Sequence, residues 1–283
     1  MSINIEIIPS KSYAHRALIC AALSKNESRV VCDFPSKDIL ATKSCVDVLK
    51  NGGTLLACGE SGSTLRFLLP VFAALGRKGI FMAEGKLPQR PLSPLYEELE
   101  KHGCRVSPKG ENPIVIEGKL TTGDFKISGK VSSQYISGLM MALPLLEGNS
   151  RIEIEGELES ASYVDMTLDV LAKYDIVWIK KVTKSGIAYE IPYKQIFNGP
   201  GEFHVEGDWS AAAFWLCAGA IGREKITVSG LNLSSAQGDK EIVEILKNFG
   251  AEVTEGDASV TVFPSKLQGC DVDLSQIPDL GPA

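Results

Sequence analysis

The chain has 283 residues, 44% of them hydrophobic and 23% charged, which is the composition of an ordinary globular protein of two domains. The net charge is −6 and no Lys/Arg-rich run occurs, which argues against a nucleic-acid partner. No charge-free apolar run reaches the roughly 18–20 residues of a membrane span, and MSINIEIIPS does not resemble a signal peptide. We therefore expect a cytoplasmic monomer that binds neither nucleic acid nor membrane.

The seven cysteines are odd in number and scattered, and none forms a C-x-x-C pair. This spacing argues against a zinc site or a disulfide framework. Most of them, such as Cys20 and Cys217, lie within apolar patterns, so we expect them to be small core residues.

Four apolar helices are predicted along the chain, each opening with a serine. Serine is a preferred N-cap, and apolar residues then recur at the i, i+3, i+4, i+7 spacing. Few polar residues interrupt these segments, so we expect the helices to be buried on nearly all sides. The segments are residues 12–23, 63–75, 133–146 and 210–221, which begin at Ser12, Ser63, Ser133 and Ser210.

An amphipathic helix follows each apolar one, and short alternating segments typical of strands lie between the pairs. The amphipathic helices are predicted over 39–53, 93–103, 163–175 and 239–250, and strands over 112–118, 124–129, 151–156, 202–207 and 225–230. The unit is a strand, a buried helix, a strand, an outer helix and a hairpin. Serines 63, 133 and 210 are spaced by 70 and 77 residues, whereas serines 12 and 63 are only 51 apart. This indicates repeated supersecondary units, the first of which lacks its hairpin near residues 51–58.

These patterns predict an α/β (α+β) fold of repeated βαβαββ units in two domains. Glycine and proline cluster at residues 198–201, where a domain boundary is expected. Residues 10–200 form an N-terminal domain of three units with the first one shortened. Residues 1–9 and 201–283 form part of a second domain.

The first apolar helix begins with residues suited to an anion. Free N–H groups and the helix dipole place about half a positive charge at a helix N-terminus. Arg16 lies one turn after Ser12, so Lys11, Ser12 and Arg16 can surround one phosphate or carboxylate. An ordinary capped helix with a solvated lysine and arginine would show the same spacing.

The second apolar helix follows Gly59-Glu-Ser-Gly62, where glycines allow an anion to approach the backbone closely. Arg90 lies in a proline-braced loop, residues 86–91, before the next helix, and an arginine there suits a carboxylate or phosphate. A common turn and a surface arginine are the simpler alternatives for these two motifs.

Neutral hydrogen-bonding groups open two further helices. Ser132, Ser133 and Gln134 can hold a polyhydroxylated ring, and Ser160 with Tyr163 can add another hydroxyl. Asp208 and Asp279 have simpler interpretations, as a helix cap and as a turn residue after proline.

Taken together, these motifs resemble the 5-enolpyruvylshikimate-3-phosphate synthase family along essentially the whole chain. The resemblance rests on PSKSYAHR, GESGSTLR, LPQRPLSPL, VSSQYISGL, ESASYVDMTLDVL, EGDWSAAAF, SAQGD and IPDLGP, in the family's order. It implies transfer of the enolpyruvyl group of phosphoenolpyruvate to the 5-hydroxyl of shikimate 3-phosphate with release of phosphate, in aromatic amino acid biosynthesis. It also implies two domains that are each an inside-out α/β barrel of three units, and no metal or organic cofactor.

The resemblance assigns roles residue by residue. Lys11 corresponds to a residue that binds shikimate 3-phosphate and also faces phosphoenolpyruvate. Gly62 and Arg90 correspond to phosphoenolpyruvate contacts, and Gln134 to a residue that contacts both ligands. Asp279 corresponds to the carboxylate that takes the proton from the attacking hydroxyl. The residues matching the shikimate 3-phosphate site are Lys11, Ser12, Arg16, Ser132, Ser133, Gln134, Ser160 and Tyr163.

The chain departs from the family's pattern in three places. Glu60 stands where the family often has asparagine, and we expect it to point away from the anion. The first unit lacks its hairpin. The family continues for well over a hundred residues beyond the position of Asp279, so we expect the second domain to be incomplete, to expose apolar surface, and to leave these 283 residues alone poorly active.

Two other functions stay open at this stage. One is the related enolpyruvyl transferase that acts on UDP-N-acetylglucosamine, although the loop at residues 86–91 lacks the cysteine usual in that family. The other is an anion-binding fragment without catalytic activity.

Overall fold

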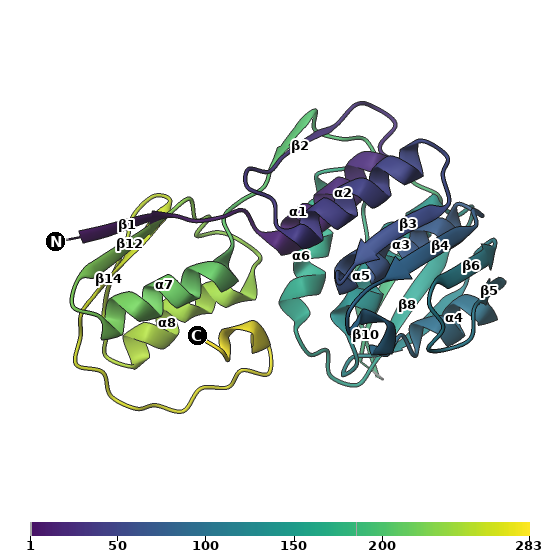
Figure 1. Cartoon of the computed structure of the whole chain (residues 1–283). Coiled ribbons are helices and arrows are strands. Elements are labelled where there is room, and N and C mark those ends of the chain that lie inside the picture. The colour runs from purple at the N-terminus through teal and green to yellow at the C-terminus, as the bar shows by residue number, and fades with distance from the viewer. Residues whose placement is uncertain (1, 185) are drawn as a thin grey trace. The chain divides into compact units, whose positions relative to one another are not determined.

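The computed structural model describes residues 2–184 and 186–283, which divide into two compact units (Figure 1). The larger unit comprises residues 11–31 and 35–203, and the smaller one comprises residues 2–10, 32–34 and 204–283. No helix in the described part of the chain is long and apolar enough to cross a membrane.

The larger unit contains six helices and two four-stranded sheets among its described residues. The helices are α1 (Lys11–Leu23), α2 (Lys37–Lys50), α3 (Gly62–Ala74), α4 (Leu95–Lys101), α5 (Ser133–Ala142) and α6 (Ala161–Ala172). The strands of the sheets are β3 (Leu55–Gly59), β4 (Gly79–Ala83), β5 (Cys104–Val106), β6 (Ile114–Gly118), β7 (Asp124–Ser128), β8 (Ser150–Glu155), β9 (Ile179–Thr183) and β10 (Gly186–Ile191). Short 3₁₀ helices, η1 (Leu87–Gln89) and η2 (Leu143–Leu145), follow β4 and α5.

Both sheets have the same topology. The first two strands are parallel, and the hairpin that follows adds its second strand beside them, giving the orders β3-β4-β6-β5 and β7-β8-β10-β9. The predicted order of strand, helix, strand, helix and hairpin is thus confirmed in the second and third repeats of the larger unit. The first repeat contains only α1, β2 (Arg29–Val31) and α2 before β3, so its hairpin is missing as expected. Strand β2 pairs instead with β11 (Glu202–His204).

The apolar helices pack against one another: α3 against α5, α5 against α6, and α6 against α1. The predicted face of α3 is confirmed, because Leu65, Leu68, Leu69 and Phe72 are fully buried. Gly138 lets α5 approach α3 closely, since a Cβ at this position would lie 2.5 Å from the Arg66 carbonyl oxygen. Helix N-termini from different repeats are thereby held in one rigid group.

The smaller unit repeats the same sheet topology with a strand from the other end of the chain. Its strands are β1 (Ser2–Glu6), β12 (Lys225–Ser229), β13 (Glu252–Glu255) and β14 (Ser259–Phe263), in the order β1-β12-β14-β13. Helices α7 (Trp209–Ile221) and α8 (Ile242–Asn248) lie side by side against this sheet (Figure 1). Two 3₁₀ helices, η3 (Gly238–Glu241) and η4 (Pro278–Leu280), contact α7.

Three of the predicted N-caps were wrong by one or two residues. The caps of α3, α5 and α7 are Ser61, Ser132 and Asp208, whose side-chain oxygens accept from backbone N–H groups of the first turn. A cap must have an extended backbone conformation, and Ser63, Ser133 and Ser210 already lie inside their helices. Ser12 likewise lies inside α1, which begins at Lys11.

The expectation of nearly complete burial was wrong for α7. Phe214, Trp215 and Ile221 are 51%, 43% and 76% exposed, whereas Trp209 and Leu216 are buried. The helix therefore buries one face against its sheet and leaves an apolar face open. Exposed apolar surface on the smaller unit was expected and is confirmed.

Candidate functional site

The start of α1 carries one exposed cation and one buried cation. Lys11 is exposed and forms an ion pair with Asp38 at 3.3 Å, a surface interaction worth at most about 1 kcal/mol. Arg16 is 2% exposed. Burial lowers the pKa of Arg16 to about 10, so the guanidinium is still charged at neutral pH. Lys11 can therefore turn to a ligand readily, whereas Arg16 is fixed.

Arg16 ties α1 to α5 and α6. Its Nε donates to Thr167 Oγ1 at 2.7 Å, and its Nη2 donates to the Tyr163 carbonyl oxygen at 2.9 Å and to Ser137 Oγ at 3.2 Å. Its Nη1 donates to the Ser12 carbonyl oxygen at 2.8 Å. Four of its five N–H groups are thus committed to the protein, which leaves one for a ligand.

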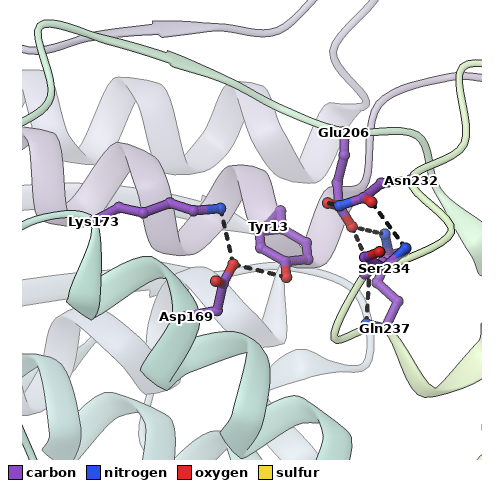
Figure 2. A network of polar contacts seen from close by, with 8 residues as sticks. Tyr13, Asp169, Lys173, Glu206, Asn232, Ser234 and Gln237 are labelled. Carbon is purple, nitrogen blue, oxygen red and sulfur yellow. Dashed lines mark hydrogen bonds and ion pairs between the residues drawn. The ribbon is translucent and has the colours of Figure 1, made fainter.

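A second bond between the same helices lies near the protein surface. Tyr13 of α1 donates to Asp169 Oδ2 of α6 at 3.0 Å, and Lys173 forms an ion pair with the same oxygen at 3.0 Å (Figure 2). Together with Arg16, this contact fixes the starts of α1 and α6 relative to each other.

Two arginines flank Gly62 at the N-terminus of α3. A Cβ on Gly62 would lie 3.2 Å from Arg66 Nη1 and 3.5 Å from Arg90 Nη1. Burial lowers the pKa of Arg66, and the neighbouring charge of Arg90 lowers it further. Two guanidinium groups beside the same helix N-terminus are chemically suited to a doubly charged anion.

Arg66 also connects this site to α5. Its Nη1 donates to Gln134 Oε1 at 2.6 Å, and Gln134 Nε2 donates to Ser63 Oγ at 3.1 Å. Its Nη2 donates to the Pro91 carbonyl oxygen at 3.3 Å, and Tyr135 Oη donates to the same carbonyl at 2.5 Å. The start of α3, the start of α5 and the Arg90 loop are therefore held together around Arg66.

The remaining predicted residues of the larger unit lie at the starts of α5 and α6. Ser132 Oγ accepts from Gln134 N at 3.3 Å, so this hydroxyl caps α5. Ser133 is half-buried beside it. Ser160 is half-buried and adopts a left-handed conformation with φ of 55°, which is costly for serine. Tyr163 is half-buried one turn further along α6.

Glu60 lies against the turn before the Arg90 loop. A Cβ on Gly85 would meet the end of the Glu60 side chain, and Gly85 has a φ of +56°, a backbone conformation that favours glycine. The Glu60 carboxylate is thus packed over Gly85, at the C-terminal end of β4.

Asp279 belongs to the smaller unit, where it is exposed on η4. Nearby, Asp239 accepts from Ser210 Oγ. Burial, together with the carboxylates of Asp279 and Asp208, raises the pKa of Asp239 to about 6 against the lowering effect of the Ser210 hydroxyl. Acidic groups are therefore concentrated near the start of α7.

A polar cluster orders the loops at the same end of the smaller unit. Glu206 accepts from Gln237 Nε2 and Asn232 Nδ2, each at 2.7 Å (Figure 2). It also accepts from Ser235 Oγ. Gln237 Oε1 accepts from the Trp209 backbone N–H at 3.1 Å. This network fixes the N-terminus of α7.

The structure thus gathers ten of the eleven predicted residues on the larger unit, at the N-termini of α1, α3, α5 and α6 and in the Arg90 loop. The role of Arg66 was missed from the sequence. Its position four residues after Gly62, as Arg16 lies four after Ser12, was the available signal. Among residues 2–184 and 186–283, no group of three or more His, Cys, Asp or Glu side chains could hold a metal ion.

The family model for EPSP synthase (3-phosphoshikimate 1-carboxyvinyltransferase) matches residues 36–283. The chain belongs to the EPSP synthase family. The 3-phosphoshikimate 1-carboxyvinyltransferase of Clostridium kluyveri is 43% identical over 301 residues, covering 99% of this chain and 69% of the relative. That of Clostridium perfringens strain 13 is 42% identical over 302 residues, covering 99% and 70%. The chain therefore spans about 70% of the length of these EPSP synthases.

The fold agrees with this membership. The structure of EPSP synthase from Acinetobacter baumannii superposes with a TM-score of 0.78 at 20% identity, covering 99% of this chain and 69% of that one. Family membership makes the chain a transferase of the shikimate pathway, which serves aromatic amino acid biosynthesis. The family match favours EPSP synthase over the related transferase that acts on UDP-N-acetylglucosamine.

Proposed function

We propose that this chain binds shikimate 3-phosphate and phosphoenolpyruvate and transfers the enolpyruvyl group of the latter to the 5-hydroxyl of the former. The new bond joins that oxygen to the enolpyruvyl carbon that carried the phosphate, and inorganic phosphate leaves. The observation that carries the proposal is the pair of guanidinium groups at Gly62, because an anion there meets Arg66, Arg90 and an open helix N-terminus together.

Each substrate has a separate set of candidate ligands. Phosphoenolpyruvate would lie at Gly62 and Arg90, with Lys11 and Gln134 reaching it from α1 and α5. The proposed ligands of shikimate 3-phosphate are Lys11, Ser12, Arg16, Ser132, Ser133, Gln134, Ser160 and Tyr163. The single uncommitted N–H of Arg16 suits one ring oxygen better than a bidentate phosphate contact.

Proton transfer and charge stabilisation are assigned to two residues. Asp279 would accept the proton of the attacking hydroxyl, and the exposed Lys11 would stabilise negative charge on phosphoenolpyruvate. A proton must also reach the methylene carbon to form a methyl group, and this methyl group must give up a proton as phosphate leaves, which restores the carbon–carbon double bond.

We further propose that residues 10–200 form one domain and that residues 1–9 with 201–283 form part of a second. Three sheets with one strand order, two in the larger unit and one in the smaller, support repeated units of the inside-out barrel type.

Isothermal titration with shikimate 3-phosphate, with and without phosphoenolpyruvate, tests binding, and a continuous assay of released phosphate tests turnover. We expect the first ligand to bind and to strengthen binding of the second. Lys11→Ala should abolish any turnover, whereas Lys109→Ala, which removes an exposed lysine paired with Glu97, should not. Absence of shikimate 3-phosphate binding by the unmodified chain would contradict the proposal.

A further inference from the structure

A buried chain of hydrogen-bonded side chains joins three helices of the larger unit. His15 Nδ1 lies 2.7 Å from Thr42 Oγ1, which lies 2.6 Å from Thr64 Oγ1. Thr64 Oγ1 donates to Ser61 Oγ at 2.7 Å. All four side chains are at most 1% exposed. This His15 relay, formed by His15, Thr42, Thr64 and Ser61, runs from α1 through α2 to the N-cap of α3.

The donors in the His15 relay can be ordered from its α3 end. Thr64 has one hydroxyl hydrogen and donates it to Ser61, so Thr64 must accept from Thr42. Thr42 has then spent its own hydrogen and must accept from His15 Nδ1. The ring proton of His15 is therefore on Nδ1.

The surroundings of His15 agree with this tautomer. Burial, followed by the charges of Arg16 and Lys11, lowers the pKa of His15 to about 3, so the ring is neutral at physiological pH. Its Nε2 is buried and has no hydrogen-bond partner in the described part of the chain, and the ring packs edge-on against Phe67. With the proton on Nδ1, this unpartnered nitrogen is a bare acceptor rather than a stranded donor.

At the α3 end of the relay, the Ser61 hydroxyl keeps its own hydrogen. Ser61 Oγ accepts from both the backbone N–H and the hydroxyl of Thr64, at 3.3 and 2.7 Å. No acceptor for its own hydroxyl hydrogen is found among the hydrogen bonds of the described residues, and Ser61 directly precedes Gly62, beside which Arg66 and Arg90 lie. In the reverse order, Ser61 would donate to Thr64 and this hydrogen would be lost to a ligand.

We propose that His15 is a positioning residue for the phosphoenolpyruvate site: as the Nδ1–H tautomer, it fixes the relay so that Ser61 offers its hydrogen to the anion at the start of α3. This role rests on the proposed function. The relay also couples the start of α1, which carries Lys11, to the start of α3 through buried bonds alone.

The first test needs neither ligand nor variant. In ¹⁵N-labelled protein, the histidine two-bond correlation spectrum should show His15 with a protonated Nδ1 and a bare Nε2 that do not change between pH 5 and 8. The resonance is assigned as the one missing from His15→Asn. A protonated Nε2, or an averaged tautomer, would overturn the assigned order.

The second test compares Thr42→Val with Thr42→Ser. Valine keeps the shape and removes the hydroxyl, whereas serine keeps the hydroxyl, so only valine breaks the relay. In the ligand-free protein, exchange of the Thr64 amide hydrogen should be about tenfold faster in Thr42→Val than in Thr42→Ser, because the Ser61 cap is no longer held. Equal exchange in the two variants would overturn the positioning role.

A binding measurement then extends the comparison to the ligand. With saturating shikimate 3-phosphate present, Thr42→Val should weaken binding of phosphoenolpyruvate about tenfold relative to Thr42→Ser. If the unmodified protein binds neither ligand, the proposed function is wrong, while the tautomer and the exchange rates still decide the relay.

Discussion

Replacing His15 by asparagine should make the protein less sensitive to acid. An asparagine amide can occupy the position of the imidazole Nδ1 and still donate to Thr42, but it cannot titrate. In the folded protein the pKa of His15 is lowered from 6.5 to about 3 by burial and by two neighbouring cations. The substitution therefore isolates the cost of burying a neutral imidazole that becomes protonated on unfolding.

The sign and size of the effect follow from this difference in pKa. Below pH 6.5 the unfolded chain binds a proton at His15 that the folded protein does not, so stability falls as the pH falls towards 3. The loss is about 1.4 kcal/mol per pH unit within that window. Between pH 7 and pH 5, the unmodified protein should lose about 2 kcal/mol more than His15→Asn.

Urea unfolding at pH 7 and pH 5, extrapolated linearly to water, measures this difference for both proteins. Any packing defect in His15→Asn is present at both pH values and cancels in the comparison. His102 and His204 are unchanged in the variant, so their contributions cancel as well. Equal losses in the two proteins would refute the argument, because His15 would then be free to take up a proton in the folded state.

Three further substitutions test other parts of the structure. Gly138→Ala should lower the free energy of unfolding in urea by about 2 kcal/mol, because the added Cβ would lie 2.5 Å from an α3 backbone oxygen. Gly269→Ala is the control and should leave the stability unchanged, because no atom lies within 4 Å of a Cβ at that position. Burial raises the folded pKa of Asp239 from 3.8 to about 6, so the unmodified protein loses stability as the pH rises from 4 to 7. Asp239→Asn removes this loss, so its stability relative to the unmodified protein should increase by about 2 kcal/mol between pH 4 and pH 7. Parallel curves of unfolding free energy against pH for the two proteins would contradict this. Arg90→Ala should weaken phosphoenolpyruvate binding by about a hundredfold in calorimetry, whereas Arg105→Ala, an exposed cation paired with a glutamate, should bind normally.

The features that sequence predicted well are those fixed by neighbouring residues. The spacing of Leu65, Leu68, Leu69 and Phe72 predicted a buried helix because a helix face depends only on its own period. The caps were less accurate, since the choice between Ser61 and Ser63 depends on which residue adopts the extended conformation, and both are serines.

The features that could not be predicted depend on residues far apart in the chain. Residues 1–9 were assigned to the same domain as residues 201–283, but the parallel pairing of β1 with β12, more than 200 residues away, was not predicted because no local pattern specifies a strand's partner. The sequence of α7 shows that it is apolar on all sides, but not how many other elements pack against it. Phe214 and Trp215 were therefore expected to be buried, and both are exposed. The His15 relay also needs Thr42 from a separate helix, and its order appears only when the hydrogens are assigned.

The cations of the larger unit divide into two kinds, which differ in burial and in the hydrogen bonds that they donate to the protein. Arg16 and Arg66 each lie one turn inside an apolar helix, and both spend hydrogen bonds on the start of a neighbouring helix. Lys11 and Arg90 are exposed, and Lys11 pairs with Asp38. Like charges repel, so a fold that keeps several cations close must hold them with its own oxygens. Protein oxygens hold the two inner arginines, which favours helix N-termini that are already assembled for the proposed anionic substrates.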